Sequence, residues 1–149
     1  MSALRDLYQE VVVDHGRRPR NFGRLEQASH RAEGFNPLCG DHLTLYLKMS
    51  GDVIGDARFD GRGCAISTAS ASLMTEALKG KTAAQAEALF ASFHALLTGG
   101  PIPADAPPLG KLDVLAGVRE FPSRVKCATL AWHTLHAALH AAAQPTSTE

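Results

Sequence analysis

The chain has 149 residues, 45% of them hydrophobic, with 15 acidic and 15 basic residues and a formal net charge of zero. This length suits one globular domain that buries a core without disulfides, and the balanced charge argues against nucleic acid or an anionic membrane as partner. The sequence contains no apolar run of the roughly 18 to 20 residues that a membrane span needs, and its first residues do not resemble a signal peptide. We therefore expect a single domain over residues 1–149, located in the cytoplasm.

The first half of the chain predicts one helix followed by a β-hairpin. Ser2 can cap a helix that runs to about Asp14, because apolar residues recur there at helical spacing. Apolar and polar residues then alternate over 43–49 and again over 53–59, with a Ser-Gly-Asp turn between the two runs. This pattern is typical of two antiparallel strands with one buried face.

The second half predicts three helices. Glycines end the second strand, and the apolar period then changes, which places Cys64 at the start of a helix. Thr82 and Gln85 form a capping box for the next helix, which ends at a pair of glycines. Pro122 suits the first turn of a last helix, whose apolar stripe leaves Cys127 on another side.

The three cysteines are the main chemical signal in the sequence. An odd number of cysteines in a reducing compartment argues against a disulfide framework and favours thiol chemistry or a metal. Cys39 and Asp41 lie where the first hairpin strand begins and Cys64 lies where its partner ends, so these residues can converge. Cys127 joins them if the last helix docks there. Three thiolates and one carboxylate would fill a tetrahedral Zn²⁺ site.

Ordinary structural roles stay open for several of these residues. Free cysteines are commonly buried as small hydrophobes, and no Cys-x-x-Cys pair marks a zinc motif. His133, His136 and His140 share one helical face, which we interpret as solvated because no carboxylate or thiol accompanies them. His15 and His42 are ambiguous. The arginines of "GRRPRN" are interpreted as part of a solvated loop, with partner docking as the alternative.

A resemblance to a known family is carried by four segments, "DHGRRPRNFG", "NPLCGD", "GRGCAISTASASLMTE" and "FPSRVKCATLAWHTL". Together they resemble the U-type (IscU/NifU N-terminal-like) iron–sulfur cluster assembly family, in the right order and over about residues 7 to 139. The resemblance implies an α+β fold, a small three-stranded antiparallel sheet with helices packed on it. It also assigns a metal site to Cys39, Asp41, Cys64 and Cys127.

Three differences from scaffold-type members of this family indicate its SufU branch. Those members carry a histidine immediately before the last cysteine, where this chain has Lys126. They also carry a Leu-Pro-Pro-Val-Lys chaperone-recognition motif, where this chain has "FPSRV". Members of the SufU branch have an extra segment before the last helix, for which about 90–111 is the candidate. The tail over about 143–149 is predicted to be disordered.

The SufU branch implies sulfur transfer. A SufS-type cysteine desulfurase would make a persulfide, and this chain would act as a zinc-dependent sulfurtransferase that accepts the terminal sulfur for downstream iron–sulfur assembly proteins. Cys39 is the candidate acceptor, because its glycine-flanked loop can swing outward. Arg124 and Lys126 would favour the negatively charged thiolate or persulfide. We expect Zn²⁺ as the cofactor.

Two other functions fit the same residues. An iron–sulfur scaffold would assemble a cluster on the same thiolates, with Lys126 or Asp41 in place of the missing histidine. A structural zinc domain would act only through its surface, and its ligands would be held on rigid elements, unlike the glycine-flanked Cys39.

Overall fold

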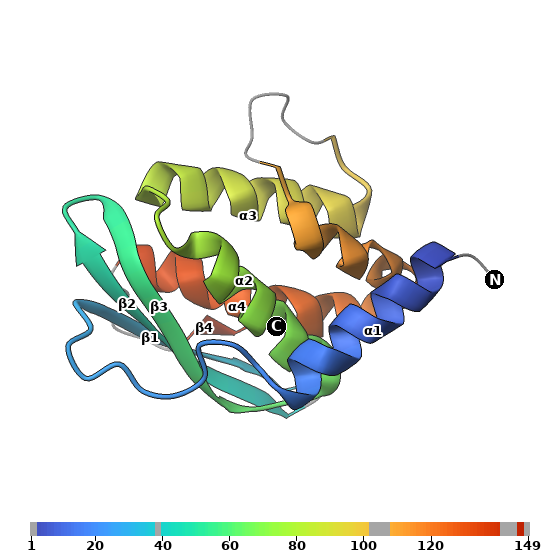
Figure 1. Cartoon of the computed structure of the whole chain (residues 1–149), viewed down its shortest axis with the longest axis horizontal. Helices are drawn as coiled ribbons and strands as arrows, with labels where there is room; N and C mark the ends of the chain where they lie inside the picture. Colours follow the sequence, from blue (N-terminus) through green and yellow to red (C-terminus); the bar gives the residue numbers. More distant parts are fainter. Residues whose placement is uncertain (1–2, 38–39, 102–107, 141–145, 148–149) are drawn as a thin grey trace.

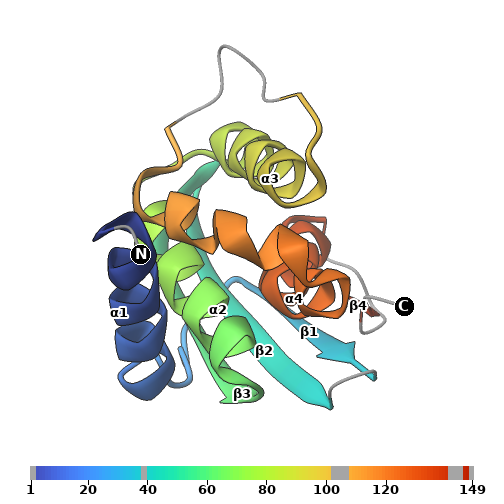
Figure 2. The same cartoon turned by 90° about the vertical axis from the view of Figure 1, so that its right-hand side faces the viewer.

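The computed structural model describes residues 3–37, 40–101, 108–140 and 146–147. The elements follow one another as α1 (Ala3–Arg17), β1 (His30–Asn36), β2 (Asp41–Ser50), β3 (Val53–Arg62), α2 (Ala65–Leu78), α3 (Ala83–Thr98), the 3₁₀ helix η1 (Gly110–Glu120), α4 (Pro122–Leu139) and β4 (Thr146–Ser147). Figures 1 and 2 show the sheet on one side of the molecule, with α2 and α4 packed on it and α1 and α3 farther out. This α+β architecture confirms the predicted fold class.

The sheet is antiparallel over β1, β2 and β3, with β2 in the centre. Asn36 of β1 lies opposite Asp41 of β2, and His42 lies opposite Arg62 of β3. The end of β1, the start of β2 and the end of β3 therefore meet at one end of the sheet. The short strand β4 runs parallel to β1. The disordered tail over about 143–149 stays a prediction.

Strand β1 was not part of the predicted hairpin, because it lacks large apolar residues at its buried positions. The side chains that face the helices are those of Ala32 and Asn36, with Gly34 between them. A β carbon at Gly34 would collide with the hydroxyl of Thr134 on α4. Close packing of α4 on β1 thus requires small residues and removes the alternation by which a strand is usually predicted.

The helix ends predicted from the sequence agree with the structure at several positions. Cys64 is the N-cap of α2, and the capping box of Thr82 and Gln85 begins α3. Gly99 ends α3 in the left-handed conformation, with φ of 79°. Helix α1 extends to Arg17, three residues beyond the predicted end, and the sequence pattern did not predict η1.

Helices α2 and α4 are joined by buried hydrogen bonds and pack together on the sheet. The hydroxyl of Ser70 on α2 donates to the carbonyl of Ala128 on α4 over 2.5 Å and accepts from Trp132 Nε1 over 3.2 Å. The fully buried ring of Trp132 stacks on Phe93 of α3, with 4.8 Å between ring centroids.

Among the described helices, none has the length and apolar character needed to cross a membrane.

Candidate metal centre

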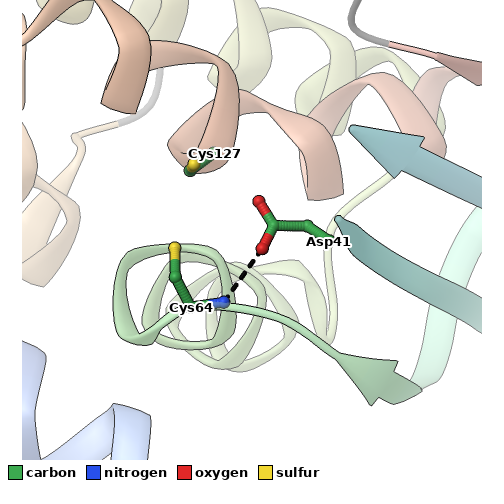
Figure 3. A group of neighbouring side chains, drawn as sticks. All are labelled: Asp41, Cys64 and Cys127. Atoms are coloured by element: carbon green, nitrogen blue, oxygen red, sulfur yellow. Dashed lines mark hydrogen bonds between the residues drawn. The ribbon is translucent and has the colours of Figure 1, made fainter. Parts of the chain in front are cut away.

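Three of the four predicted ligands meet where β2, α2 and α4 come together. Asp41 is the first residue of β2, Cys64 caps α2, and Cys127 lies in the second turn of α4. One carboxylate oxygen and the two Sγ atoms lie within 4.8 Å of one another. Figure 3 shows the three side chains directed into the same space. Cys39 lies outside the described residues, and its role as the fourth ligand stays a prediction.

The position of Asp41 is set by the backbone around Cys64. Its Oδ1 accepts a hydrogen bond from the Cys64 N–H over 2.9 Å, and the residue is 1% exposed. The preceding Gly63 makes room for this carboxylate, since a β carbon there would lie 2.8 Å from Asp41 Oδ1. A carboxylate is thus fixed at the end of the sheet by a glycine and by a helix N-terminus.

Asn36 completes the surroundings of the buried ligands. Its Nδ2 donates to Asp41 Oδ2 over 3.3 Å and to Cys127 Sγ over 3.6 Å, and it is 1% exposed. The sequence alone predicts no role for Asn36, although this residue begins the "NPLCGD" segment. No sequence pattern marked it, because its burial and its contact with Cys127 depend on how α4 packs near the end of β1. Asn36 thus contacts atoms of two candidate ligands without being a candidate ligand itself.

The two described cysteines differ in exposure. Cys64 is partly exposed, and its Sγ accepts a hydrogen bond from the Ser67 N–H over 3.4 Å in the first turn of α2. Cys127 is completely buried. Cys64 lies beside the N–H groups at the N-terminus of α2, which carry partial positive charge.

Three other residues singled out in the sequence have exposed side chains, namely Arg124, Lys126 and His42. The side chains of Arg124 and Lys126 are exposed on the first turns of α4, and their predicted role toward Cys39 stays a prediction. His42 is half exposed and lies 3.6 Å from Glu33.

His15 has a structural role in the packing of α1 on α2. It is buried, and its Nδ1 lies 2.7 Å from Ser72 Oγ. Burial lowers the pKa of His15, and the nearby charge of Arg20 lowers it further. The neutral imidazole is therefore the form that this packing favours.

The donor set suits a thiophilic metal ion. Thiolate and carboxylate ligands both bind Zn²⁺, and thiolates also hold the irons of iron–sulfur clusters. The hydrogen bonds from Asn36 and Cys64 fix the carboxylate of Asp41 and leave oxygen lone pairs available for a metal ion. The residues present therefore fit a bound metal, with a fourth ligand still to be supplied.

An α+β fold with two cysteines and one aspartate gathered at the end of its sheet defines a small domain suited to thiolate–metal chemistry. Residues 7–128 match the family model of the NifU-like N terminal domain. The chain belongs to this family, which confirms the resemblance found in its motifs.

Known proteins align with this chain over most of its length. The "Zinc-dependent sulfurtransferase SufU" of Bacillus subtilis is 44% identical over 132 residues, 89% of this chain and 88% of that protein. The "Iron-sulfur cluster assembly scaffold protein IscU" of Streptococcus pyogenes is also 44% identical, over 93% of this chain and 86% of its own. The crystal structure of a putative SUF-system scaffold protein from Fervidobacterium islandicum superposes with a TM-score of 0.83 at 36% identity, over 90% of this chain and 97% of that one.

Proposed function

We propose that this protein is a zinc-dependent sulfur acceptor in iron–sulfur cluster assembly, receiving persulfide sulfur from a SufS-type cysteine desulfurase. The observation that carries the proposal is the group of Asp41, Cys64 and Cys127, with ligand atoms within 4.8 Å of one another. It occurs in a chain that is 44% identical to a protein named as a zinc-dependent sulfurtransferase.

Asp41, Cys64 and Cys127 would hold the zinc together with Cys39. When bound, Zn²⁺ keeps coordinated thiols deprotonated. The chain itself supplies the orientation of the ligands. The Cys64 N–H and the Asn36 amide hold the two carboxylate oxygens of Asp41 in place.

Cys39 is the proposed sulfur acceptor because the other two cysteines are anchored. Cys127 is buried in α4, and the sulfur of Cys64 accepts the capping hydrogen bond of α2. Cys39 is followed by Gly40, whose φ of 73° belongs to the left-handed region that glycine adopts without strain. The Cys39 thiolate would attack the terminal sulfur of the desulfurase persulfide. A persulfide then forms on Cys39, the sulfur–sulfur bond of the donor breaks, and the desulfurase cysteine leaves as a thiolate.

A second candidate function is the assembly of an iron–sulfur cluster on the same side chains. It is favoured by the relative from Streptococcus pyogenes, which is named as a scaffold protein. Cysteine thiolates are the usual ligands of such clusters, and Asp41 would provide the oxygen ligand. The exposed Lys126 stands where the scaffold-type members of the family carry a histidine, which weighs against this alternative.

Metal analysis together with a sulfur-transfer assay separates the two functions. The chain is purified without added metal, and its zinc, iron and visible absorption are measured. It is then incubated with a SufS-type desulfurase and cysteine, and persulfide is trapped by alkylation. We expect a colourless protein with about one zinc per chain that acquires persulfide. A brown protein with about two irons per chain that acquires no persulfide would contradict the proposal.

A further inference from the structure

A second group of metal-ligating side chains lies on the outer surface of α3 and α4. It consists of Glu87 on α3, His136 on α4 and His140 at the C-terminal end of α4. One carboxylate oxygen and two imidazole nitrogens lie within 4.8 Å of one another. The sequence predicts a solvated helical face for these histidines, with no carboxylate beside them. The packing of α3 beside α4 supplies that carboxylate.

We propose that Glu87, His136 and His140 form a binding site for a divalent transition-metal ion of the zinc type. Two imidazoles and one carboxylate are borderline ligands that suit Zn²⁺, Ni²⁺ and Co²⁺, whereas Mg²⁺ and Ca²⁺ prefer oxygen ligands alone. The histidines are four residues apart, the spacing that brings two side chains together on one face of a helix. Their ring centroids are 4.4 Å apart.

The distances between the ligand atoms suit a shared ion. His136 Nδ1 lies 3.1 Å from Glu87 Oε1, and His140 Nε2 lies 4.0 Å from the same oxygen. Ligands that bind one ion at about 2.0 to 2.2 Å are separated by roughly 3 to 3.5 Å in tetrahedral or octahedral geometry. Small side-chain rotations therefore bring all three atoms to binding distance, and no movement of the helices is required.

The helices that carry the ligands are held by buried aromatic packing. Phe93 of α3 stacks on Trp132 of α4, and Phe90 lies 5.2 Å from the ring of His133 in an edge-to-face contact. Ligands on packed helices lose less conformational freedom on binding than ligands on loops. The helix backbones that carry Glu87 and His136 are therefore held in position without a bound ion.

The site is open to solvent and separate from the thiolate centre. Its three side chains are 35%, 53% and 62% exposed for Glu87, His136 and His140, respectively. An open groove of about 510 Å³ extends from Glu87 and His136 toward His94. At 1.5 Å of helix rise per residue, His136 and His140 lie roughly 13 to 20 Å along α4 from Cys127. An ion bound here would have coordination positions left for water or an exchanging ligand. It would have no ligand residue in common with the thiolate centre.

Calorimetric titration with Zn²⁺ tests this site on the untagged chain after its thiolate centre has been loaded. We expect one further zinc equivalent for the wild type. The double variant His136→Gln/His140→Gln should lose it, and Glu87→Gln should weaken it by at least about tenfold. His94→Gln is the matched control, an exposed histidine on α3 outside the group, and should bind as the wild type does.

Thermal unfolding provides a second measurement on the same proteins. Because the ion would join α3 to α4, added Zn²⁺ should raise the melting temperature of the wild type and of His94→Gln, but not that of the double variant. Circular dichroism verifies that each variant is folded. The proposal is overturned if the loaded wild type binds no further zinc, or if the folded double variant binds it with unchanged affinity.

Discussion

The carboxylate of Asp41 accepts a hydrogen bond of 2.9 Å from the backbone N–H of Cys64 (Figure 3). One candidate metal ligand therefore fixes the backbone position of another. The N–H groups in the first turn of a helix lack partners within the helix, and this bond satisfies one at the cap of α2. The second carboxylate oxygen accepts from Asn36 over 3.3 Å. Asp41 therefore has a structural role even without metal.

Replacing Asp41 should separate these two roles. Asp41→Ala removes both hydrogen bonds and should lower the free energy of unfolding of the metal-free chain by about 1 to 3 kcal/mol. The side chain in Asp41→Asn can still accept one hydrogen bond, from Cys64 or from Asn36, but it has no negative charge. This variant should therefore destabilise the fold less than Asp41→Ala does, while still weakening zinc binding. Urea unfolding and zinc content are the measurements. Equal stability of the metal-free Ala variant and wild type would contradict the capping role.

Gly63 offers a test that leaves every ligand in place. In Gly63→Ala the new β carbon would lie 2.8 Å from Asp41 Oδ1, so the carboxylate must move and the bond from Cys64 must lengthen. We expect zinc affinity to fall by roughly 10- to 100-fold, as when an orienting group is disturbed. Gly55→Ala is the matched control, because its β carbon would meet only the Lys48 carbonyl at 3.4 Å. Similar zinc affinities for the two variants would rule out this effect of Gly63.

Removal of the metal should destabilise the fold. The described candidate ligands come from the start of β2, the cap of α2 and the second turn of α4, so an ion bound there would tie together distant segments. Binding energy of this kind contributes to folding, and chelation should lower the melting temperature by at least roughly 5 °C. Cys127→Ala, already lacking one ligand, should respond much less to the chelator. A melting temperature that stays constant after verified zinc removal would contradict the assignment.

The sequence predicted those parts of the fold that depend on local signals. The capping box of Thr82 and Gln85, the glycine that ends α3 and the place of Cys64 at the start of α2 each depend on a few neighbouring residues. Strand β1 was missed because the requirement for Gly34 comes from Thr134, a hundred residues away. Contacts of this range leave no periodic pattern in the sequence.

The two candidate sites also combine features that local sequence signals predict with features that depend on long-range packing. The pairing of His42 with Arg62 follows from the hairpin, so the sequence could indicate that Asp41 and Cys64 lie close together. The role of Asn36 could not be predicted, because it depends on how α4 places Cys127 near the end of β1. Glu87 and His136 are 49 residues apart, and only the packing of α3 on α4 joins them.

Stability should fall with acid partly through His15. Burial lowers its folded-state pKa below the ordinary value of 6.5, so the unfolded chain binds the proton more readily. The free energy of unfolding should therefore decrease as the pH falls from about 6.5 toward the lowered pKa, and level off below it. His15→Gln keeps a polar group beside Ser72 and should show a weaker pH dependence in metal-free urea unfolding. Identical pH profiles for wild type and variant would disprove this contribution.

Native mass spectrometry after incubation with a SufS-type desulfurase and cysteine tests whether a zinc-bound chain accepts sulfur on Cys39, because one spectrum reports both bound zinc and added sulfur. We predict that the wild type carries one zinc and gains one sulfur atom, and that Cys39→Ala keeps much of its zinc but gains no sulfur. Cys64→Ala and Cys127→Ala should lose zinc, since each lacks an anchored ligand. Cys39 is not the acceptor if Cys39→Ala still gains sulfur while Cys64→Ala or Cys127→Ala keeps its zinc and loses only the transfer.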